Sequence, residues 1–419
     1  MPKNYVPVKS KKECRACGSK SLALFFDLGN TVLANSFVYR ENLGKPESAY
    51  PLRVFFCRNC SFVQLGEVVR PDILFRDYIY FSTGVITVPE HFRKYAEEIT
   101  SNFITQKDDF VLEIGSNDGV LLGAVKDLGV RVLGIDPAVN IAKAANERGI
   151  PTIPEFFSAK LAMKVRKEHG PAKVMVGNNV VAHINDLHDL VRGVSLVLAD
   201  DGVFIFEAPY LKDMFDNLTF DTIYHEHLSY LSVRPLIPLF KKFGLQIFDV
   251  KTVPVQGNSL RVYVSKLGQR PVSESVAHFV REEEKFGLAS LDNYLQLVVR
   301  IDDLKNRVVN LLRDLKGKGK RIAGYGAPAK GNTLLHYFGI GPEILEYATE
   351  ELPSKIGLLT PGTHIPIIHV SESRKNPPDY YLMLAWNAHD AIIKNEREFL
   401  ARGGKFIMPV KAGNIIDIS

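Results

Sequence analysis

Apolar and polar positions recur along this chain with two different periods. Four short apolar runs predict strands at 110–114, 130–135, 174–177 and 203–206. Helical stretches between them include 120–126 and 139–148. Apolar strands alternating with amphipathic helices are typical of a parallel sheet covered on both faces. Segments 245–250 and 260–266 lie close in sequence and are expected to add an antiparallel end. The pattern predicts a doubly wound α/β domain.

The flanking regions follow other patterns. Short strands are expected at 22–26 and 52–56, and a helix at about 89–103. Apolar residues then recur every three or four positions, at Leu291, Tyr294, Val298, Ile301, Leu304, Val308, Leu311 and Leu315. This stripe predicts a long helix bridging two domains, ended by Gly317 and Gly319. A second α/β unit is expected after it, with strands at 321–324, 346–349, 380–385 and 405–408.

The predicted class is therefore α/β, with a small N-terminal domain, a central Rossmann-like domain and a C-terminal Rossmann-like domain. The expected segments are 1–70, 71–270, the bridging helices 271–316, and 317–419.

Composition narrows the class of protein. The 419 residues are 46% hydrophobic and 24% charged, which is too apolar for a disordered chain. No uncharged apolar run reaches the roughly 18 residues that span a bilayer. The net charge of +5 is spread along the chain, so we expect no nucleic-acid partner. The basic N-terminus lacks the apolar core of a secretory signal, so a cytoplasmic location is expected.

All four cysteines lie in the first 60 residues, as the pairs Cys14/Cys17 and Cys57/Cys60. Two Cys-x-x-Cys knuckles together supply the tetrahedral four-sulfur shell that zinc prefers. Redox dithiols or disulfides are the alternative, but no thioredoxin-like pattern follows either pair. We expect a closed, structural Zn²⁺ that stabilises a domain with little core of its own.

The run from Val111 to Leu122 carries the first cofactor motif, with Glu113, Gly115, Asn117, Asp118 and Gly119 at the end of a strand. The glycines permit a tight turn and close approach of a ligand. The run is not the G-x-G-x-x-G dinucleotide fingerprint, and an acid at Glu113 would repel a pyrophosphate. S-adenosylmethionine, which has none, fits better than NAD(P), the remaining alternative.

Seventeen residues beyond Gly119, Asp136 and Pro137 end the next strand. A carboxylate at this place can accept hydrogen bonds from both ribose hydroxyls of an adenosine. The run from Leu198 to Glu207 also resembles the fifth-strand signature of class I methyltransferases.

The segment from Asp221 to Tyr230 concentrates proton-transfer groups, namely Tyr224, His225, Glu226 and His227. Acid/base catalysis by a histidine, oriented by the intervening acid, is the favoured interpretation. A metal bound by the two histidines and a solvated polar loop remain alternatives.

Three further places could bind a substrate. Asn179 and His183 follow the fourth strand and would share one face of a helical turn, although Asn179 could simply cap a helix. The segment 75–84 is rich in tyrosine, including Tyr78, and could equally be packing at a domain seam. Lys330 lies in a glycine-rich strand-to-helix turn that could cradle an anion or bind nothing.

These motifs together resemble the three-domain, S-adenosylmethionine-dependent C-methyltransferases that act on nucleotide-linked deoxysugars. The resemblance covers essentially the whole chain and includes the segments 324–330, 360–366 and 385–387. It differs at 256–261, where many members carry His-Gly-Gly, and at His225, which is variable in the family.

The resemblance implies roles for individual residues. His227 would remove the proton from C3 of a 4-keto sugar, with Tyr224 and Glu226 beside it. Tyr78, Asn179 and His183 would line the sugar pocket, and the C-terminal unit would close over the nucleotide sugar. Loss of the C3 proton gives an enolate, the carbanion equivalent that C-methylation requires. O- or N-methylation and a non-enzymatic zinc- and nucleotide-binding regulator are the alternatives. A monomer or weak homodimer is expected.

Overall fold

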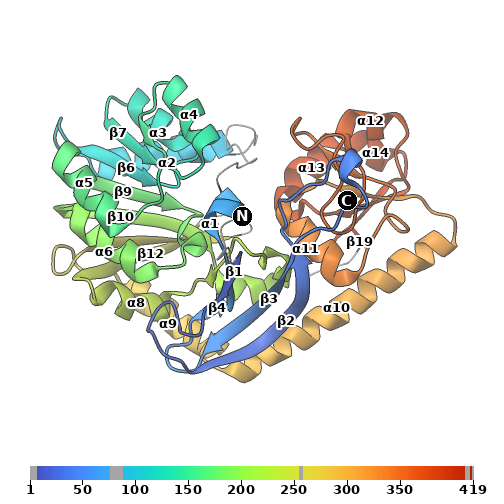
Figure 1. The fold of residues 1–419 in the computed structure, drawn as a ribbon, viewed down its shortest axis with the longest axis horizontal. Helices are drawn as coiled ribbons and strands as arrows, with labels where there is room; N and C mark the ends of the chain where they lie inside the picture. Colours follow the sequence, from blue (N-terminus) through green and yellow to red (C-terminus); the bar gives the residue numbers. More distant parts are fainter. Residues whose placement is uncertain (1–6, 76–87, 254–257, 411–415, 418–419) are drawn as a thin grey trace. The chain divides into compact units, whose positions relative to one another are not determined.

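The computed structural model describes residues 7–75, 88–253, 258–410 and 416–417 (Figure 1). The chain forms two compact units, each built from separated segments. The first unit comprises Met1–Ala23, Phe55–Leu211 and Leu228–Ser290, and the second comprises Leu24–Val54, Lys212–His227 and Leu291–Ser419. The four sequential segments expected from the sequence remain a prediction.

A seven-stranded sheet forms the centre of the first unit, in the order β12-β13-β10-β9-β6-β7-β8. Its strands are β6 (Phe110–Ile114), β7 (Arg131–Ile135), β8 (Thr152–Ile153), β9 (Ala172–Asn178), β10 (Leu198–Pro209), β12 (Leu245–Val253) and β13 (Ser259–Lys266). Strands β6 to β10 pair in parallel, whereas β13 is antiparallel to both β10 and β12. The predicted parallel sheet with an antiparallel end is confirmed.

Helices cover both faces of this sheet. They are α2 (Val88–Phe103), α3 (Val120–Asp127), α4 (Val139–Glu147), α5 (Ala159–His169), α6 (Leu187–Val197), α8 (Val233–Lys241) and α9 (Glu274–Phe286). Successive side chains of a strand point to opposite faces. Leu112 accordingly packs in a core with α5, α6 and α8, and Val111 in a separate core with α2 and α3. Burial on both faces explains why β6 is apolar almost throughout.

Most of the smaller elements precede this sheet in the sequence, and two of them, β11 and η3, lie between its strands. Strand β1 (Val8–Ser10) pairs with β5 (Glu67–Val69), and a four-stranded sheet has the order β11-β4-β3-β2. The remaining bounds are β2 (Leu22–Val32), β3 (Ala49–Cys57), β4 (Val63–Leu65), β11 (Ser229–Tyr230), α1 (Pro71–Phe75) and the 3-10 helices η1 (Arg40–Asn42) and η3 (Val181–His183). Strand β2 continues six residues beyond the predicted end at 26, so most of it belongs to the second unit.

A six-stranded sheet organises the second unit, in the order β16-β15-β14-β17-β18-β19. Its strands are β14 (Ile322–Tyr325), β15 (Ala348–Glu350), β16 (Ile367–His369), β17 (Tyr380–Met383), β18 (Lys405–Ile407) and β19 (Ile416–Asp417). All are parallel except β19. The helices are α7 (Leu211–Asn217), η4 (Phe220–Thr222), α10 (Leu291–Gly317), α11 (Ala329–Phe338), α12 (Val370–Lys375), η5 (Trp386–Ala388), α13 (His389–Asn395) and α14 (Arg397–Ala401).

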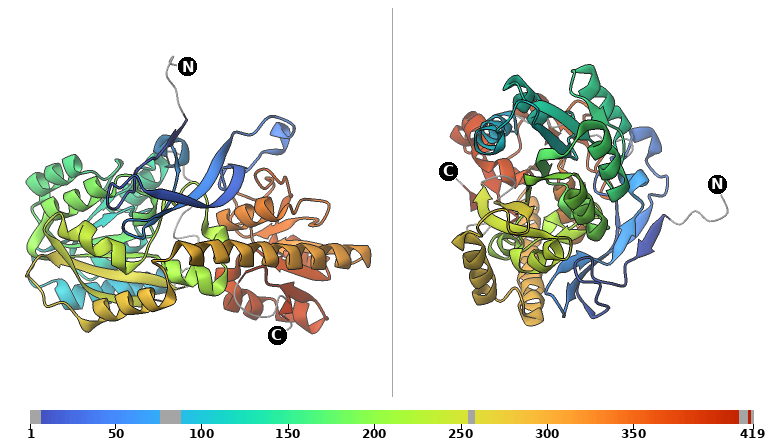
Figure 2. Two further views of the ribbon diagram at one scale, coloured as in Figure 1. Left: turned by 90° about the horizontal axis from the view of Figure 1, so that it is seen from below. Right: turned by 90° about the vertical axis from the view of Figure 1, so that its left-hand side faces the viewer.

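The long predicted helix forms as α10, which Figure 2 shows as one continuous helix. Five of the eight positions in the predicted stripe are buried, and Leu297, Val309 and Leu312 are buried as well. Among the described residues, no helix is long and apolar enough to cross a membrane.

Each of the two parallel sheets has a topological switch point, where the order of the strands reverses direction. In the first unit this point lies between β6 and β9, and in the second between β14 and β17. In open α/β sheets, ligands bind beyond the carboxyl ends of the strands at such a point. Each unit therefore offers one expected ligand site.

Candidate active site and zinc centre

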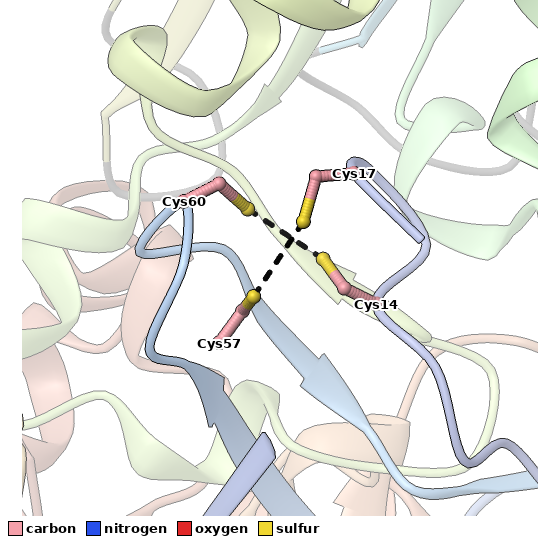
Figure 3. A group of neighbouring side chains, drawn as sticks. All are labelled: Cys14, Cys17, Cys57 and Cys60. Atoms are coloured by element: carbon pink, nitrogen blue, oxygen red, sulfur yellow. Dashed lines mark hydrogen bonds between the residues drawn. The ribbon is translucent and has the colours of Figure 1, made fainter. Parts of the chain in front are cut away.

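Four cysteine sulfurs from two loops point toward one another (Figure 3). The Sγ atoms of Cys14 and Cys60 are 3.6 Å apart, and those of Cys17 and Cys57 are 3.7 Å apart. All four lie within 4.8 Å of one another. Zn–S bonds of about 2.3 Å in a tetrahedron place neighbouring sulfurs about 3.8 Å apart. The cluster fits one Zn²⁺ with four protein ligands, which leaves no position for a substrate.

The two knuckles share one backbone conformation. The amide of Gly18 donates to the carbonyl oxygen of Cys14 at 2.9 Å, and the amide of Ser61 donates to that of Cys57 at 2.8 Å. Gly18 and Ser61 occupy the same place in their knuckles, with φ of 76° and 64°. The left-handed region suits glycine and strains serine. Repetition of the turn at both pairs shows that the backbone is arranged to present thiolates.

The loop between β6 and α3 turns sharply. Gly115, Asn117 and Gly119 have φ of 65°, 49° and 80°. A Cβ on Gly115 would lie 2.8 Å from Cγ2 of Val180, and one on Gly119 would lie 2.9 Å from Cγ2 of Ile150. Glycine is therefore required at both positions by conformation and by space.

Asp136 anchors this loop from the end of β7. Its Oδ2 accepts from the amide of Asn117 and its Oδ1 from the amide of Ala138, each at 2.9 Å. Burial raises the pKa of Asp136, and the two backbone donors act in the opposite direction. Each carboxylate oxygen has a second lone pair, so the group can still accept ribose hydroxyls. Pro137 follows it, half-buried.

Glu113 and Asn178 end the neighbouring strands β6 and β9, where the strand order turns back. Burial raises the pKa of Glu113 well above its usual range, and the charges of Asp136 and Asp118 add to the effect. Among the described residues, Oε2 of Glu113 and both amide atoms of Asn178 are buried without a well-formed hydrogen bond, and the amide of Asn178 lies close enough to Glu113 to lower its pKa. Buried polar groups are normally satisfied. These atoms therefore fit the polar methionine end of S-adenosylmethionine.

Asp118 is only 2% exposed and is held by Arg148, the residue that follows α4. Nη1 of Arg148 donates to its carbonyl oxygen at 3.0 Å and lies 3.4 Å from its Oδ2. The structure gives this side chain an anchoring contact, and its contact with a cofactor stays a prediction.

Asn179 and His183 do not share a helical turn, so that expectation is wrong. Asn179 has φ of 54°, which interrupts the helical backbone, and the 3-10 helix covers only Val181–His183. The Oδ1 of Asn179 is buried without a partner among the described residues. The ring of His183 packs against Phe75, with centroids 5.8 Å apart. Tyr78 lies outside the described residues.

Tyr224 and His227 form a hydrogen-bonded pair just after η4. The Tyr224 hydroxyl lies 2.9 Å from Nε2 of His227, and Nδ1 of His227 lies 2.7 Å from the carbonyl oxygen of Thr222. A carbonyl only accepts, so Nδ1 carries the proton and Nε2 accepts from the phenol. Burial lowers the pKa of His227 to about 4. The imidazole is therefore neutral at physiological pH and can take up a proton.

Glu226 receives support from a residue that sequence reasoning missed. Nδ2 of Asn35 donates to Oε1 of Glu226 at 2.6 Å, and Glu226 is 3% exposed. The adjacent carbonyl of Ala34 accepts from Nδ2 of Asn332 at 2.7 Å. The chain after β2 thus contacts both the acidic side chain and α11. No sequence signal joins Asn35 to a residue 191 positions away.

His225 has a different environment from His227. Its Nε2 lies 3.3 and 3.2 Å from the carbonyl oxygens of Tyr50 and Pro51, so this nitrogen donates. Burial lowers its pKa to about 4. In the part of the chain that the structure describes, neither histidine belongs to a group able to bind a metal.

Lys330, the second residue of α11, belongs to a buried cluster in the second unit. Its Nζ lies 3.8 Å from the centroid of the Trp386 ring, and Nε1 of Trp386 donates to Oδ2 of Asp221 at 2.6 Å. Burial lowers the pKa of Lys330 to about 8, an effect that the charge of Asp221 opposes. Burial raises the pKa of Asp221 to about 6, which Lys330 opposes. The sequence motifs contained Asp221 and Trp386, but nothing assigned them a role.

Three protein-family models match successive parts of the chain. The "Putative zinc binding domain" matches residues 14–75, the "Methyltransferase domain" matches 90–250, and the "C-methyltransferase C-terminal domain" matches 254–411. The four cysteines lie in the first match, the motif from Glu113 to Asp136 in the second, and Lys330 in the third.

Two solved methyltransferase structures are among those that match a part of the chain. Magnesium protoporphyrin IX methyltransferase ChlM from Synechocystis PCC 6803 is 10% identical, with 42% of this chain and 79% of that one covered at a TM-score of 0.32. An S-adenosylmethionine-dependent methyltransferase from Clostridium acetobutylicum ATCC 824 is 13% identical, with 43% and 92% covered at a TM-score of 0.34.

A relative in sequence matches the whole length. C-methyltransferase NovU of Streptomyces niveus is 37% identical over 410 residues, which cover 98% of each chain. This similarity and the three successive family models confirm the predicted cofactor, S-adenosylmethionine, and the predicted types of domain. The chain belongs to the family of three-domain C-methyltransferases and is an S-adenosylmethionine-dependent methyltransferase.

Proposed function

We propose that this enzyme methylates a carbon next to the ketone of a nucleotide-linked 4-keto deoxysugar, with C3 as the expected position. The observation that carries the proposal is the half-buried, hydrogen-bonded pair of Tyr224 and His227. Its neutral imidazole has a protonated Nδ1 bonded to Thr222 and an accepting Nε2. Methylation of an oxygen needs no carbon acid, whereas an α-carbon must lose a proton before it can become a nucleophile.

In the proposed reaction, the Tyr224 hydroxyl turns its hydrogen away from Nε2 of His227, the C3–H bond breaks and the proton ends on the freed lone pair of Nε2. The electron pair forms the C3–C4 double bond, and the ketone oxygen becomes an enolate oxygen. Tyr224, whose hydroxyl donates to Nε2 before the substrate is in place, would orient the base, and Glu226, fixed by Asn35, would orient the sugar. When bound, S-adenosylmethionine supplies the electrophilic methyl group.

The proposed cofactor contacts lie in the first unit. Asp136 and Pro137 would hold the adenosine ribose. The turn from Gly115 to Gly119, which includes Asn117 and Asp118, would lie along the cofactor and contact it. Glu113 would bind its methionine end. Support comes from the buried polar atoms of Glu113 and Asn178, which make no well-formed hydrogen bond among the described residues. Tyr78, Asn179 and His183 remain the proposed sugar contacts from the resemblance.

Hydrogen exchange tests the carbon-acid step. Thymidine-diphosphate-4-keto-6-deoxyglucose serves as the probe, in D₂O, with enzyme and S-adenosylhomocysteine, which cannot donate a methyl group. We expect deuterium at an α-carbon of the ketone, and methyl on that carbon when S-adenosylmethionine is used. Exchange at C5 instead of C3 would correct the position. Methyl on an oxygen or nitrogen, or no exchange at either α-carbon, would refute the proposal.

A further inference from the structure

Lys330 is a buried cation next to the proposed base. It is 9% exposed, and its positive charge lowers the pKa of His227. Among the described residues, no side chain or carbonyl accepts a hydrogen bond from its Nζ; the contact it makes there is with the face of the Trp386 ring, at 3.8 Å. A ring face attracts a cation but does not use its N–H donors. The ammonium group therefore keeps donors for a ligand.

Asp221 and Trp386 form a support for this cation. Asp221 is fully buried on η4, and its Oδ2 accepts from Nε1 of Trp386 at 2.6 Å. The indole thereby fixes the carboxylate and at the same time presents its ring to Lys330. A buried cation needs a nearby opposite charge, and Asp221 supplies it without a direct salt bridge that would occupy the ammonium.

The topology of the second unit places these groups at one edge of the sheet. Lys330 lies in the first turn of the helix after β14, and Trp386 begins η5 after β17. These two strands are parallel neighbours, and the strand order turns back between them. The cluster therefore occupies the ligand site that the fold predicts.

Removal of the proton from C3 places a negative charge on the ketone oxygen, and a neutral imidazole with a low pKa is a weak base. A cation at that oxygen would lower the barrier. We propose that Lys330 stabilises the enolate oxygen of the substrate, and that Asp221 and Trp386 are positioning residues for its ammonium group. This inference rests on the proposed carbon-acid function.

The step balances without any further reactant. The C3–H electron pair becomes the C3–C4 π bond, the C4–O π pair moves to oxygen, and the proton goes to His227. Lys330 keeps its protons and donates one hydrogen bond to the new oxyanion.

Deuterium exchange into the thymidine-diphosphate probe, with S-adenosylhomocysteine bound to the zinc-loaded enzyme, tests the role of Lys330. Lys330→Met keeps an unbranched side chain that is only one atom shorter and removes the charge. Loss of one donor to a developing oxyanion slows reactions by about 10²–10³-fold, so exchange should fall by that factor while the probe concentration at half-maximal rate changes little. Lys305→Met is the matched control, because Lys305 lies 4.5 Å from the Tyr337 ring and outside the cluster. It should exchange like the wild type.

Trp386→Phe tests the positioning role, because it keeps an aromatic face and removes the N–H donor. Exchange should slow on the order of tenfold, the usual effect of a hydrogen bond to a charged group. The indole N–H lowers the pKa of Asp221, so its removal should raise that pKa. The acid limb of the pH profile of the exchange rate should therefore move to higher pH. An unchanged acid limb would refute the positioning role. Affinity for S-adenosylhomocysteine, measured by calorimetry, reports whether each variant is folded.

The outcomes distinguish a failure of the proposed function from a failure of the role proposed for Lys330. Wild-type enzyme that exchanges neither α-hydrogen refutes the proposed function. Wild-type exchange with equal exchange in Lys330→Met refutes only the role of Lys330. Weaker binding of thymidine diphosphate to Lys330→Met, with normal exchange at saturation, would make Lys330 a phosphate ligand. If borohydride traps the sugar covalently on Lys330, the lysine acts by forming an imine with the ketone and not by stabilising the charge on the enolate oxygen.

Discussion

The phenol of Tyr224 donates to Nε2 of His227 at 2.9 Å, while the other ring nitrogen of His227 is fixed by the carbonyl of Thr222. The arrangement gives the imidazole one tautomer and one direction for proton uptake. His227→Asn should therefore abolish both deuterium exchange and methylation, with a loss of about 10²–10⁴-fold. Tyr224→Phe should cause a smaller loss, because it removes an orienting hydrogen bond and leaves the base.

Affinity for S-adenosylhomocysteine, measured by calorimetry, is the control for both variants and should stay near that of the wild type. Near-normal turnover in His227→Asn together with a dead Tyr224→Phe would reverse the assignment and make the phenol the base.

Asn35→Ala should reduce turnover through Glu226. The change removes the 2.6 Å hydrogen bond that fixes the Glu226 carboxylate, and a bond to a charged group typically contributes about 1.5–3 kcal/mol. We expect kcat to fall about tenfold or more. Glu226→Gln should cost a similar amount, and the double variant should cost little more than either single change. Additive losses in this cycle would show that Asn35 acts elsewhere.

Asp136→Ala should weaken cofactor binding. The carboxylate organises the turn through the amide of Asn117 and is proposed to accept the ribose hydroxyls. Its loss should cost about 1–3 kcal/mol, or roughly tenfold or more in affinity, by calorimetry with S-adenosylhomocysteine. Asp127→Ala, on the exposed end of α3, is the control and should bind normally. Unchanged affinity in Asp136→Ala would mean that the ribose lies elsewhere.

Zinc should be present at about one ion per chain by elemental analysis. The protein has four cysteines, all in the cluster, so a thiol reagent reports on this site alone. Cys57→Ser should lower the zinc content and release the remaining thiols to the reagent. Ser61→Gly relieves the left-handed φ of 64° without touching a ligand and should retain the metal. Full occupancy after replacement of all four cysteines would contradict the assignment.

Local patterns predicted most of the secondary structure, and long-range pairing explains what they missed. Strand β6 has the expected bounds because both of its faces are buried and it is apolar except for Glu113. The helical turn expected after β9 fails because Asn179 adopts a left-handed φ, which an asparagine permits but its neighbours in sequence do not reveal. The residues of the sequence motifs could be recognised from their neighbours in the sequence. The bonds from Asn35 to Glu226 and from Trp386 to Asp221 join residues 191 and 165 positions apart, and no period or spacing encodes them.

His225→Gln should make the second unit less sensitive to acid. Burial lowers the pKa of His225 from 6.5 to about 4, so between these values the unfolded chain binds a proton that the folded chain does not. Stability therefore rises with pH in this window and is lost as the pH falls below about 6.5. For His225 alone, the loss between pH 7 and pH 5 is about 2 kcal/mol. Glutamine can still donate to the carbonyls of Tyr50 and Pro51 and has no such proton to take up.

Trp386 is the single tryptophan of the chain and is buried in the second unit, so its fluorescence reports the unfolding of that unit in urea. The difference in unfolding free energy between pH 7 and pH 5 should be about 2 kcal/mol smaller in His225→Gln than in the wild type. His227 shifts in the same direction and Asp221 in the opposite one, but both are present in both proteins and cancel in the comparison. His278→Gln, at an exposed position of α9, should leave the pH dependence unchanged. An equal pH dependence in wild type and His225→Gln would show that His225 takes up its proton in the folded state, which its burial opposes more strongly than its two carbonyl contacts favour.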